Sequence, residues 1–100
     1  MSVLPSPAAA PDADDENHPL FVAFTVLARA EPGVMPRVVE LFAKRGLVPR
    51  SWHSTVTDQS LTIDVAVGGL GRELGDYLAR CMRQIIGVDT VLTSEMRISG

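Results

Sequence analysis

The side chains that most often do chemistry in proteins are few in this chain, and they stand apart from one another. Its one cysteine, Cys81, lies in an apolar helical stripe, which predicts a buried and unreactive thiol. His53 lies in a strand-like run and His18 near the N-terminus, and neither has a cysteine or carboxylate at the spacing of metal ligands. We therefore expect no metal, no cofactor and no catalytic residues, and an enzyme is the least favoured class of function.

Backbone amides that precede two predicted helices are better candidates for binding a ligand. The run of residues 68–71, GGLG, lacks the lysine and the Ser or Thr of a phosphate-binding loop, so it predicts a plain strand-to-helix turn. Pro32 and Gly33 open the other helix, where Gly33 is expected to use its freedom at positive φ. The amides of Gly33 and Val34 would then be exposed at a helix N-terminus, ready for a carboxylate of a ligand or of a partner protein.

The stretch from Glu31 to Gly46 predicts the helix that presents these amides. Pro36 fits only the first helical turn, and Gly46 is placed to end the helix. Four apolar residues recur at helical spacing and define the buried face: Val34, Val38, Leu41 and Phe42. The opposite face carries Arg37, Glu40 and Lys44, which are candidates for docking a partner, although an ordinary solvated face explains them equally well.

Five further stretches predict strands and a second helix around this one. Residues 20–28 are apolar on both faces, as in a central strand, and residues 50–57 and 61–67 form a hairpin around a turn at 58–60. Residues 72–86 predict a second amphipathic helix that ends at Gly87, and residues 90–98 predict a last strand. The order predicts an α+β fold, the ferredoxin-like βαββαβ arrangement, with a four-stranded antiparallel sheet and two helices on one face.

Length and composition indicate one small domain with an acidic extension. Of 100 residues, 46% are apolar and 21% are charged, which suits a packed core over residues 20–98. Residues 1–19 are rich in Pro, Ala and Asp and predict a disordered N-terminal extension, either a solvated linker or a functional acidic tail. The extension holds four of the 12 acidic residues and none of the nine Lys or Arg, so the rest is nearly neutral, which argues against nucleic acid as a partner.

Several features absent from the sequence indicate the cellular compartment and the oligomeric state that we expect. No basic segment followed by an apolar run opens the chain, and no stretch approaches the roughly 20 apolar residues that span a bilayer. A single cysteine makes no internal disulfide and suits a reducing compartment, so we expect a cytoplasmic protein without a membrane partner. Because so small a core gives only about 5–10 kcal/mol of stability, a second subunit on an exposed edge would help, and we expect a homodimer.

The residues of the first helix carry a resemblance to a known family. Residues 32–38, PGVMPRV, followed by residues 41–46, LFAKRG, resemble the ACT domain, a small amino-acid-sensing module in which a proline-glycine turn opens helix one and an arginine-glycine pair closes it. Within that family the chain is most similar to the small regulatory subunit of acetolactate synthase, whose helix ends in the same pattern before a strand that carries a serine like Ser51. The resemblance covers residues 20–98.

The resemblance implies a non-catalytic partner of an enzyme. Small subunits of that kind dimerise side by side, bind a thiamine-diphosphate-dependent large catalytic subunit, raise its activity and in many cases let a branched-chain amino acid inhibit it. In such a dimer, Val48, Pro49 and Arg50 would come to the effector site from the facing second strand of the other subunit. The implied effector site comprises Ala30, Glu31, Pro32, Gly33, Val34, Met35, Val48 and Pro49.

Departures from the family pattern predict weak feedback by valine. Valine-sensitive relatives carry asparagine or aspartate where this chain has Ala30, and asparagine where it has Val48, so partners for the ligand are missing. Pro49 also removes a backbone donor at the same site. The alternative interpretation is a free-standing amino-acid-binding ACT domain that regulates another metabolic enzyme, because the sequence does not show the partner.

Overall fold

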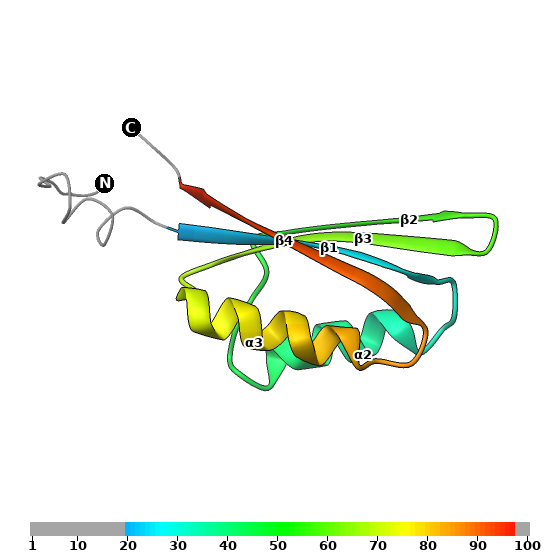
Figure 1. The fold of residues 1–100 in the computed structure, drawn as a ribbon, viewed down its shortest axis with the longest axis horizontal. Coiled ribbons are helices and arrows are strands. Elements are labelled where there is room, and N and C mark those ends of the chain that lie inside the picture. Colours follow the sequence, from blue (N-terminus) through cyan, green and yellow to red (C-terminus); the bar gives the residue numbers. More distant parts are fainter. Residues whose placement is uncertain (1–19, 98–100) are drawn as a thin grey trace, which may run out of the picture.

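The computed structural model describes residues 20–97, so the extension predicted for residues 1–19, and Ile98, lie outside the described residues. Along the chain the elements are strand, helix, strand, strand, helix and strand (Figure 1). Their bounds are β1 Leu20–Arg29, α2 Val34–Ala43, β2 Ser51–Thr57, β3 Ser60–Gly68, α3 Arg72–Arg83 and β4 Val88–Arg97. The predicted βαββαβ fold with a four-stranded antiparallel sheet is confirmed.

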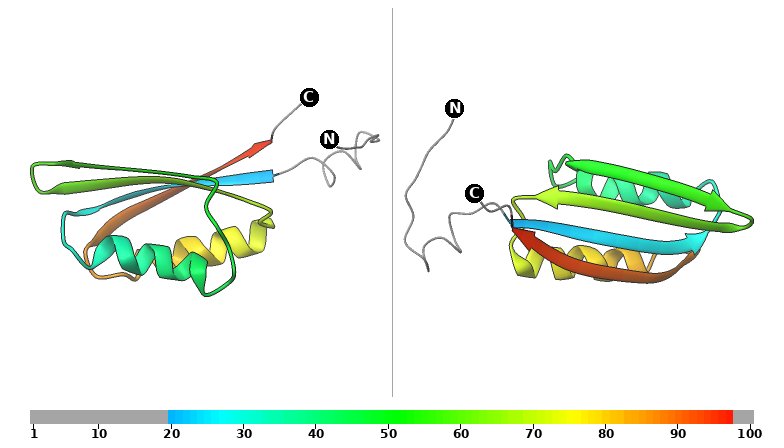
Figure 2. Two further views of the ribbon diagram at one scale, coloured as in Figure 1. Left: turned by 180° about the vertical axis from the view of Figure 1, so that it is seen from behind. Right: turned by 90° about the horizontal axis from the view of Figure 1, so that it is seen from above.

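The first strand is central, as its apolar sequence predicts. The strand order is β2-β3-β1-β4, and β1 pairs antiparallel with both β3 and β4. Both helices cover one face of the sheet and leave the other face open (Figure 2). On the open face Leu27 is 37% exposed. Phe21 is buried there, because its ring packs over Gly68 on β3 and the Arg50 guanidinium lies 4.7 Å from the centre of the ring.

The core lies between the sheet and the two helices. The alternation predicted for the third strand is confirmed, since Leu61, Ile63, Val65 and Val67 are all buried. On α2 the predicted stripe is buried at Val34, Val38 and Phe42, whereas Leu41 is half-buried. The Phe42 ring packs 5.9 Å from that of Phe24 on β1. Each such side chain contributes about 1.5–3 kcal/mol when fully buried, so this stripe fixes α2 against the sheet.

Two turns differ from the sequence prediction. Gly33 has φ −81° and caps the start of α2 in a helical conformation, so the expectation that it needs positive φ is wrong. The hairpin turn has two residues, Asp58 and Gln59, rather than three. Asp58 takes φ 56°, which suits a two-residue turn because this backbone twist matches the twist of the two strands.

The second helix is shorter than the sequence predicts. It ends at Arg83, because the following amides bond to carbonyls three residues back and Gly87, at φ 101°, turns the chain so that β4 returns along β1. Cys81 is half-buried rather than buried, because it lies at the margin of the apolar stripe. No helix among residues 20–97 is long and apolar enough to cross a membrane.

Candidate functional site

Three turns meet at the end of the molecule where α2 begins. The β1–α2 turn, residues 30–33, lies between the hairpin turn at Gln59 and the α3–β4 turn at Gly87. The Arg29 amide donates to the Gly87 carbonyl at 2.8 Å, and the Ala30 amide donates to the Gln59 carbonyl at 2.9 Å. A Cβ atom on Gly87 would lie only 3.0 Å from Glu31 Oε1 and from Val34 Cγ2. The turn that opens α2 is therefore held from both sides.

An apolar groove of about 270 Å³ lies beside this turn. Leu61 is buried at its wall, and Met35 on the first turn of α2 is half-buried. Val56, on the edge strand β2, is 57% exposed and forms an open rim. The lining residues are Ala30, Glu31, Pro32, Met35, Val56 and Leu61. Its shape and chemistry suit a small apolar group, such as an aliphatic side chain.

A more polar hollow adjoins the groove and shares Ala30 and Glu31 with it. It is lined in addition by Arg29, Gln59 and Ser60. Arg29 Nε lies 3.8 Å from Glu31 Oε2, and both side chains are about half exposed or more. A pair this long and this solvated is weak, so both charged groups remain available to a bound molecule.

The helix-start amides are less available than the sequence suggests. The Val34 amide donates to the Glu31 carbonyl at 3.1 Å and its side chain is buried, so the expectation of a free Val34 amide is wrong. Among the described residues, no backbone carbonyl accepts from the Gly33 amide. The Arg37 guanidinium folds back over Gly33, since a Cβ there would lie 2.9 Å from Arg37 Nη1. The amides of Gly33 and Met35, neither of which has a backbone acceptor among the described contacts, and the Arg37 cation are what remains for an anion.

Val48 and Pro49 do not join the groove within one protomer. They lie in the connection from α2 to β2, at the opposite end of a ten-residue helix that is about 15 Å long. Val48 is 84% exposed. Their contribution to an effector site therefore requires a second copy of the chain, as the resemblance implies, and it stays a prediction.

The predicted docking residues occupy the solvent face of α2. Glu40 and Lys44 form an ion pair one turn apart, at 3.9 Å, and both are strongly exposed. Arg37 is exposed and lies over Gly33. These contacts fit an ordinary solvated helix face as well as a docking surface.

The sequence analysis missed two groove residues, Val56 and Leu61. Both come from the hairpin, far along the chain from the β1–α2 turn. Antiparallel pairing places Leu61 opposite Ala28 and so brings the start of β3 next to the end of β1. The predicted ferredoxin-like arrangement contained this signal, because that topology places the first and third strands side by side.

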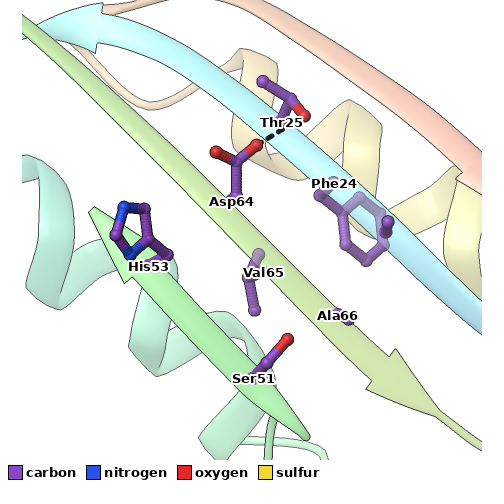
Figure 3. A pocket seen from close by; sticks show the side chains of 8 residues that line it. Phe24, Thr25, Ser51, His53, Asp64, Val65 and Ala66 are labelled. Carbon is purple, nitrogen blue, oxygen red and sulfur yellow. Dashed lines mark hydrogen bonds between the residues drawn. The ribbon is translucent and has the colours of Figure 1, made fainter. Parts of the chain in front are cut away.

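Polar side chains also gather on the open face of the sheet (Figure 3). A shallow hollow there is bordered by Ser51 and His53 on β2 and by Asp64 on β3. Thr25 Oγ1 donates to Asp64 Oδ1 at 2.8 Å. His53 Nε2 lies 3.4 Å from the hydroxyl of Thr55, which does not line the hollow, and no hydrogen bond joins His53 to Ser51 among the described contacts. No group of three or more metal-ligating side chains occurs within residues 20–97. This hollow therefore has neither an activated nucleophile nor a ligand set.

Comparison with known proteins gives one family and a set of similar folds. The family model of an ACT-like domain matches residues 15–99. No curated protein matches the chain. Among solved structures, the ACT domain of GTP pyrophosphokinase from Chlorobium tepidum is similar with a TM-score of 0.66 and 15% identity, over 74% of this chain and 96% of that one.

Two further structures share the fold. The C-terminal domain of the MgtC protein from Mycobacterium tuberculosis has a TM-score of 0.64 and 18% identity, over 82% of this chain and 92% of that domain. An ACT domain protein from Streptococcus pneumoniae has a TM-score of 0.57 and 20% identity, over 78% of this chain and 89% of that protein. At these identities the likeness extends to the fold alone.

Proposed function

Because this chain belongs to the family of ACT-like domains, we propose that it is a regulatory domain that binds a small amino acid and controls an enzyme without catalysing a reaction itself. The observation that carries the proposal is the apolar groove between the start of α2 and the hairpin. Its walls suit an aliphatic side chain, and Glu31 and Arg29 lie beside it as a carboxylate and a cation for the charged ends of an amino acid.

A second copy of the chain is part of this proposal. The edge strand β2 pairs with β3 alone and carries no lysine or proline, so one side of its backbone is open to another strand. The flank beside it exposes apolar side chains, with Val56 on β2, Val39 on α2 at 45% exposure, and Val48 in the connection between them. A side-by-side homodimer would bury this flank and close the open rim of the groove.

The effector in this proposal binds weakly. Ala30 offers no side-chain hydrogen bond at the groove, so a ligand's ammonium has only Glu31 as a charged partner. An exposed charge contact of this kind contributes at most about 1 kcal/mol. We therefore expect dissociation constants above about 100 µM for valine, leucine and isoleucine.

Thermal unfolding of the full chain with a panel of apolar amino acids tests the proposal. At a ligand concentration tenfold above its dissociation constant, the folded state gains about 1.4 kcal/mol, which raises Tm by several degrees. Met35→Glu places a carboxylate in the groove and should abolish the shift. Leu92→Glu, at an exposed apolar position on β4 that does not line the groove, is the matched control and should keep it. No shift with any amino acid, or an equal shift in Met35→Glu, contradicts the proposal.

The narrower form of the proposal names the enzyme as acetolactate synthase. Its support is the sequence pattern of residues 41–46 followed by Ser51. In this form the exposed face with Arg37, Glu40 and Lys44 docks the thiamine-diphosphate-dependent large subunit. Adding the chain to its cognate large subunit should raise acetolactate formation severalfold. An unchanged rate removes the enzyme assignment and leaves the regulatory domain standing.

A further inference from the structure

Two arginines lie against one exposed tyrosine in the helix layer. Tyr77 on α3 is 41% exposed. The Arg45 guanidinium, just after the end of α2, lies 4.7 Å from the centre of the Tyr77 ring, and the Arg80 guanidinium on α3 lies 5.9 Å from the same point. The two guanidiniums are therefore no farther apart than the sum of these two distances. Each contact is a cation–π interaction, which holds in place a long side chain that would otherwise move freely.

Packing between the two helices brings these three side chains together. Tyr77 and Arg80 are three residues apart on α3, so they share one face of that helix. Arg45 comes from a distant part of the chain and follows Lys44, the last cap residue of α2. The two helices lie side by side under the sheet and run in opposite directions (Figures 1 and 2), so the end of α2 lies beside the first half of α3.

The two guanidiniums have no carboxylate partner in the part of the chain that the structure describes. Among residues 20–97, no carboxylate oxygen lies within 4 Å of Arg45 or Arg80. Asp76 precedes Arg80 by one helical turn, yet the two form no ion pair at that distance. The hydrogen bond with Glu95, and in addition the charge of Asp76, hold the pKa of Arg72 above its usual value. The charge of Asp76 therefore acts on the arginine one turn earlier.

A phosphate group matches this cluster in charge and in shape. The Tyr77 hydroxyl has no hydrogen-bond partner among the described residues, so it is a third donor beside the two guanidiniums. A phosphate monoester carries about −1.5 to −2 charges at pH 7 and has three acceptor oxygens, which suits two cations and three donors. A carboxylate has one charge and two oxygens in one plane, so it serves donors from two helices less well. Guanidinium groups also bind phosphate through paired hydrogen bonds.

We propose that Arg45, Tyr77 and Arg80 form a binding site for the phosphate group of a small molecule. The site lies at the end of α2, whereas the apolar groove lies at its start, so a phosphate and an amino acid would bind independently of each other's contacts. A bound phosphate lies between two like charges and joins the end of α2 to α3. Because the site is exposed, we expect a dissociation constant of about 1–10 mM for inorganic phosphate.

NMR titration of the full chain tests the site with three probes at constant ionic strength: inorganic phosphate, pyrophosphate and succinate. The side-chain Nε–H signals of Arg45 and Arg80 should shift along saturating curves with the first two probes. Pyrophosphate should bind about three- to tenfold more tightly than phosphate, because it carries more charge. Succinate, a dicarboxylate, should bind more weakly than phosphate. Succinate that binds as tightly as phosphate assigns the cluster to carboxylates and overturns the proposal.

Variants separate this site from the general charge of the protein. Arg45→Gln/Arg80→Gln should weaken pyrophosphate binding at least about tenfold. Arg50→Gln/Arg72→Gln, the matched control, removes the same charge outside the cluster and should change the affinity less than about twofold. Tyr77→Leu keeps the net charge but removes the ring and the phenol, and should weaken binding about threefold or more. Shifts that never saturate, or equal losses in the two double variants, indicate an adventitious ion only and overturn the proposal.

Discussion

Replacing Gly87 by alanine is the perturbation whose cost the structure defines most fully. Gly87 has φ 101°, a conformation that a residue with a Cβ adopts only under strain of about 1–2 kcal/mol. The new Cβ would also lie 3.0 Å from Val34 Cγ2 and from Glu31 Oε1. Val34 is buried at the start of α2, so it has little room to withdraw. Crowding of this kind costs about 1–3 kcal/mol.

The two effects together give a loss of roughly 2–5 kcal/mol in the free energy of unfolding. Alanine substitutions at two other glycines distinguish the cost of backbone strain from the cost of crowding. Gly69 has φ 78° with nothing within 4 Å of an added Cβ, so Gly69→Ala should show the strain alone, about 1–2 kcal/mol. Gly71, at φ −76° and also with open space, should cost at most about 1 kcal/mol as a helix N-cap.

Urea unfolding of the three variants measures these differences from the shift of the midpoint at constant slope. Gly87→Ala should lose at least about 1 kcal/mol more free energy of unfolding than Gly69→Ala, because only Gly87→Ala adds crowding. Equal losses for these two variants would show that the contact of Gly87 with Val34 and Glu31 is looser than the structure gives. Weakened effector binding should accompany the loss in Gly87→Ala, because the same contact positions the β1–α2 turn.

Three further outcomes are expected. Gly75→Ala should stabilise the protein by about 1 kcal/mol in the same urea assay, because α3 gains helix propensity and the new methyl meets Val22 at an ordinary 3.5 Å; a destabilised variant would contradict this packing. Titration calorimetry should give no dissociation constant well below about 100 µM for valine, leucine or isoleucine, and tight binding by the unaltered chain would refute the weak-feedback argument. Ala30→Asn should tighten binding roughly two- to tenfold by restoring a hydrogen-bonding partner at an exposed position. Light scattering at micromolar concentration should show a dimer that Val56→Lys converts to a monomer, and a well-folded monomer of the unaltered chain would reject the side-by-side model.

Local patterns in the sequence were sufficient to predict the elements and the faces that they bury. The alternation from Leu61 to Val67 and the helical spacing of Val34, Val38 and Phe42 each reflect one periodic backbone geometry, which a short segment determines by itself. The order of the elements then left the ferredoxin-like arrangement as the expected topology, and it is the one observed.

Element boundaries and turn conformations depended on contacts between distant segments. Residues 84–86 continue an apolar helical pattern, yet α3 stops at Arg83 because the Gly87 carbonyl must meet the Arg29 amide for β4 to pair with β1. Gly33 follows a proline in a sequence typical of a positive-φ turn, yet it joins the helix, since the β1–α2 turn is already held by Gln59 and Gly87.

The candidate site divides in the same way. The resemblance seen in the sequence implied Ala30, Glu31, Pro32 and Met35, and they line one groove because a turn and a helix start are contiguous in the chain. Only the tertiary structure decided that Val56 and Leu61 complete the groove and that the Val34 amide is already bonded. The physical reason is that the groove is formed by two segments some 25 residues apart in the chain, which strand pairing brings together. Local propensities specify the conformation of each segment but not the distance between the two segments.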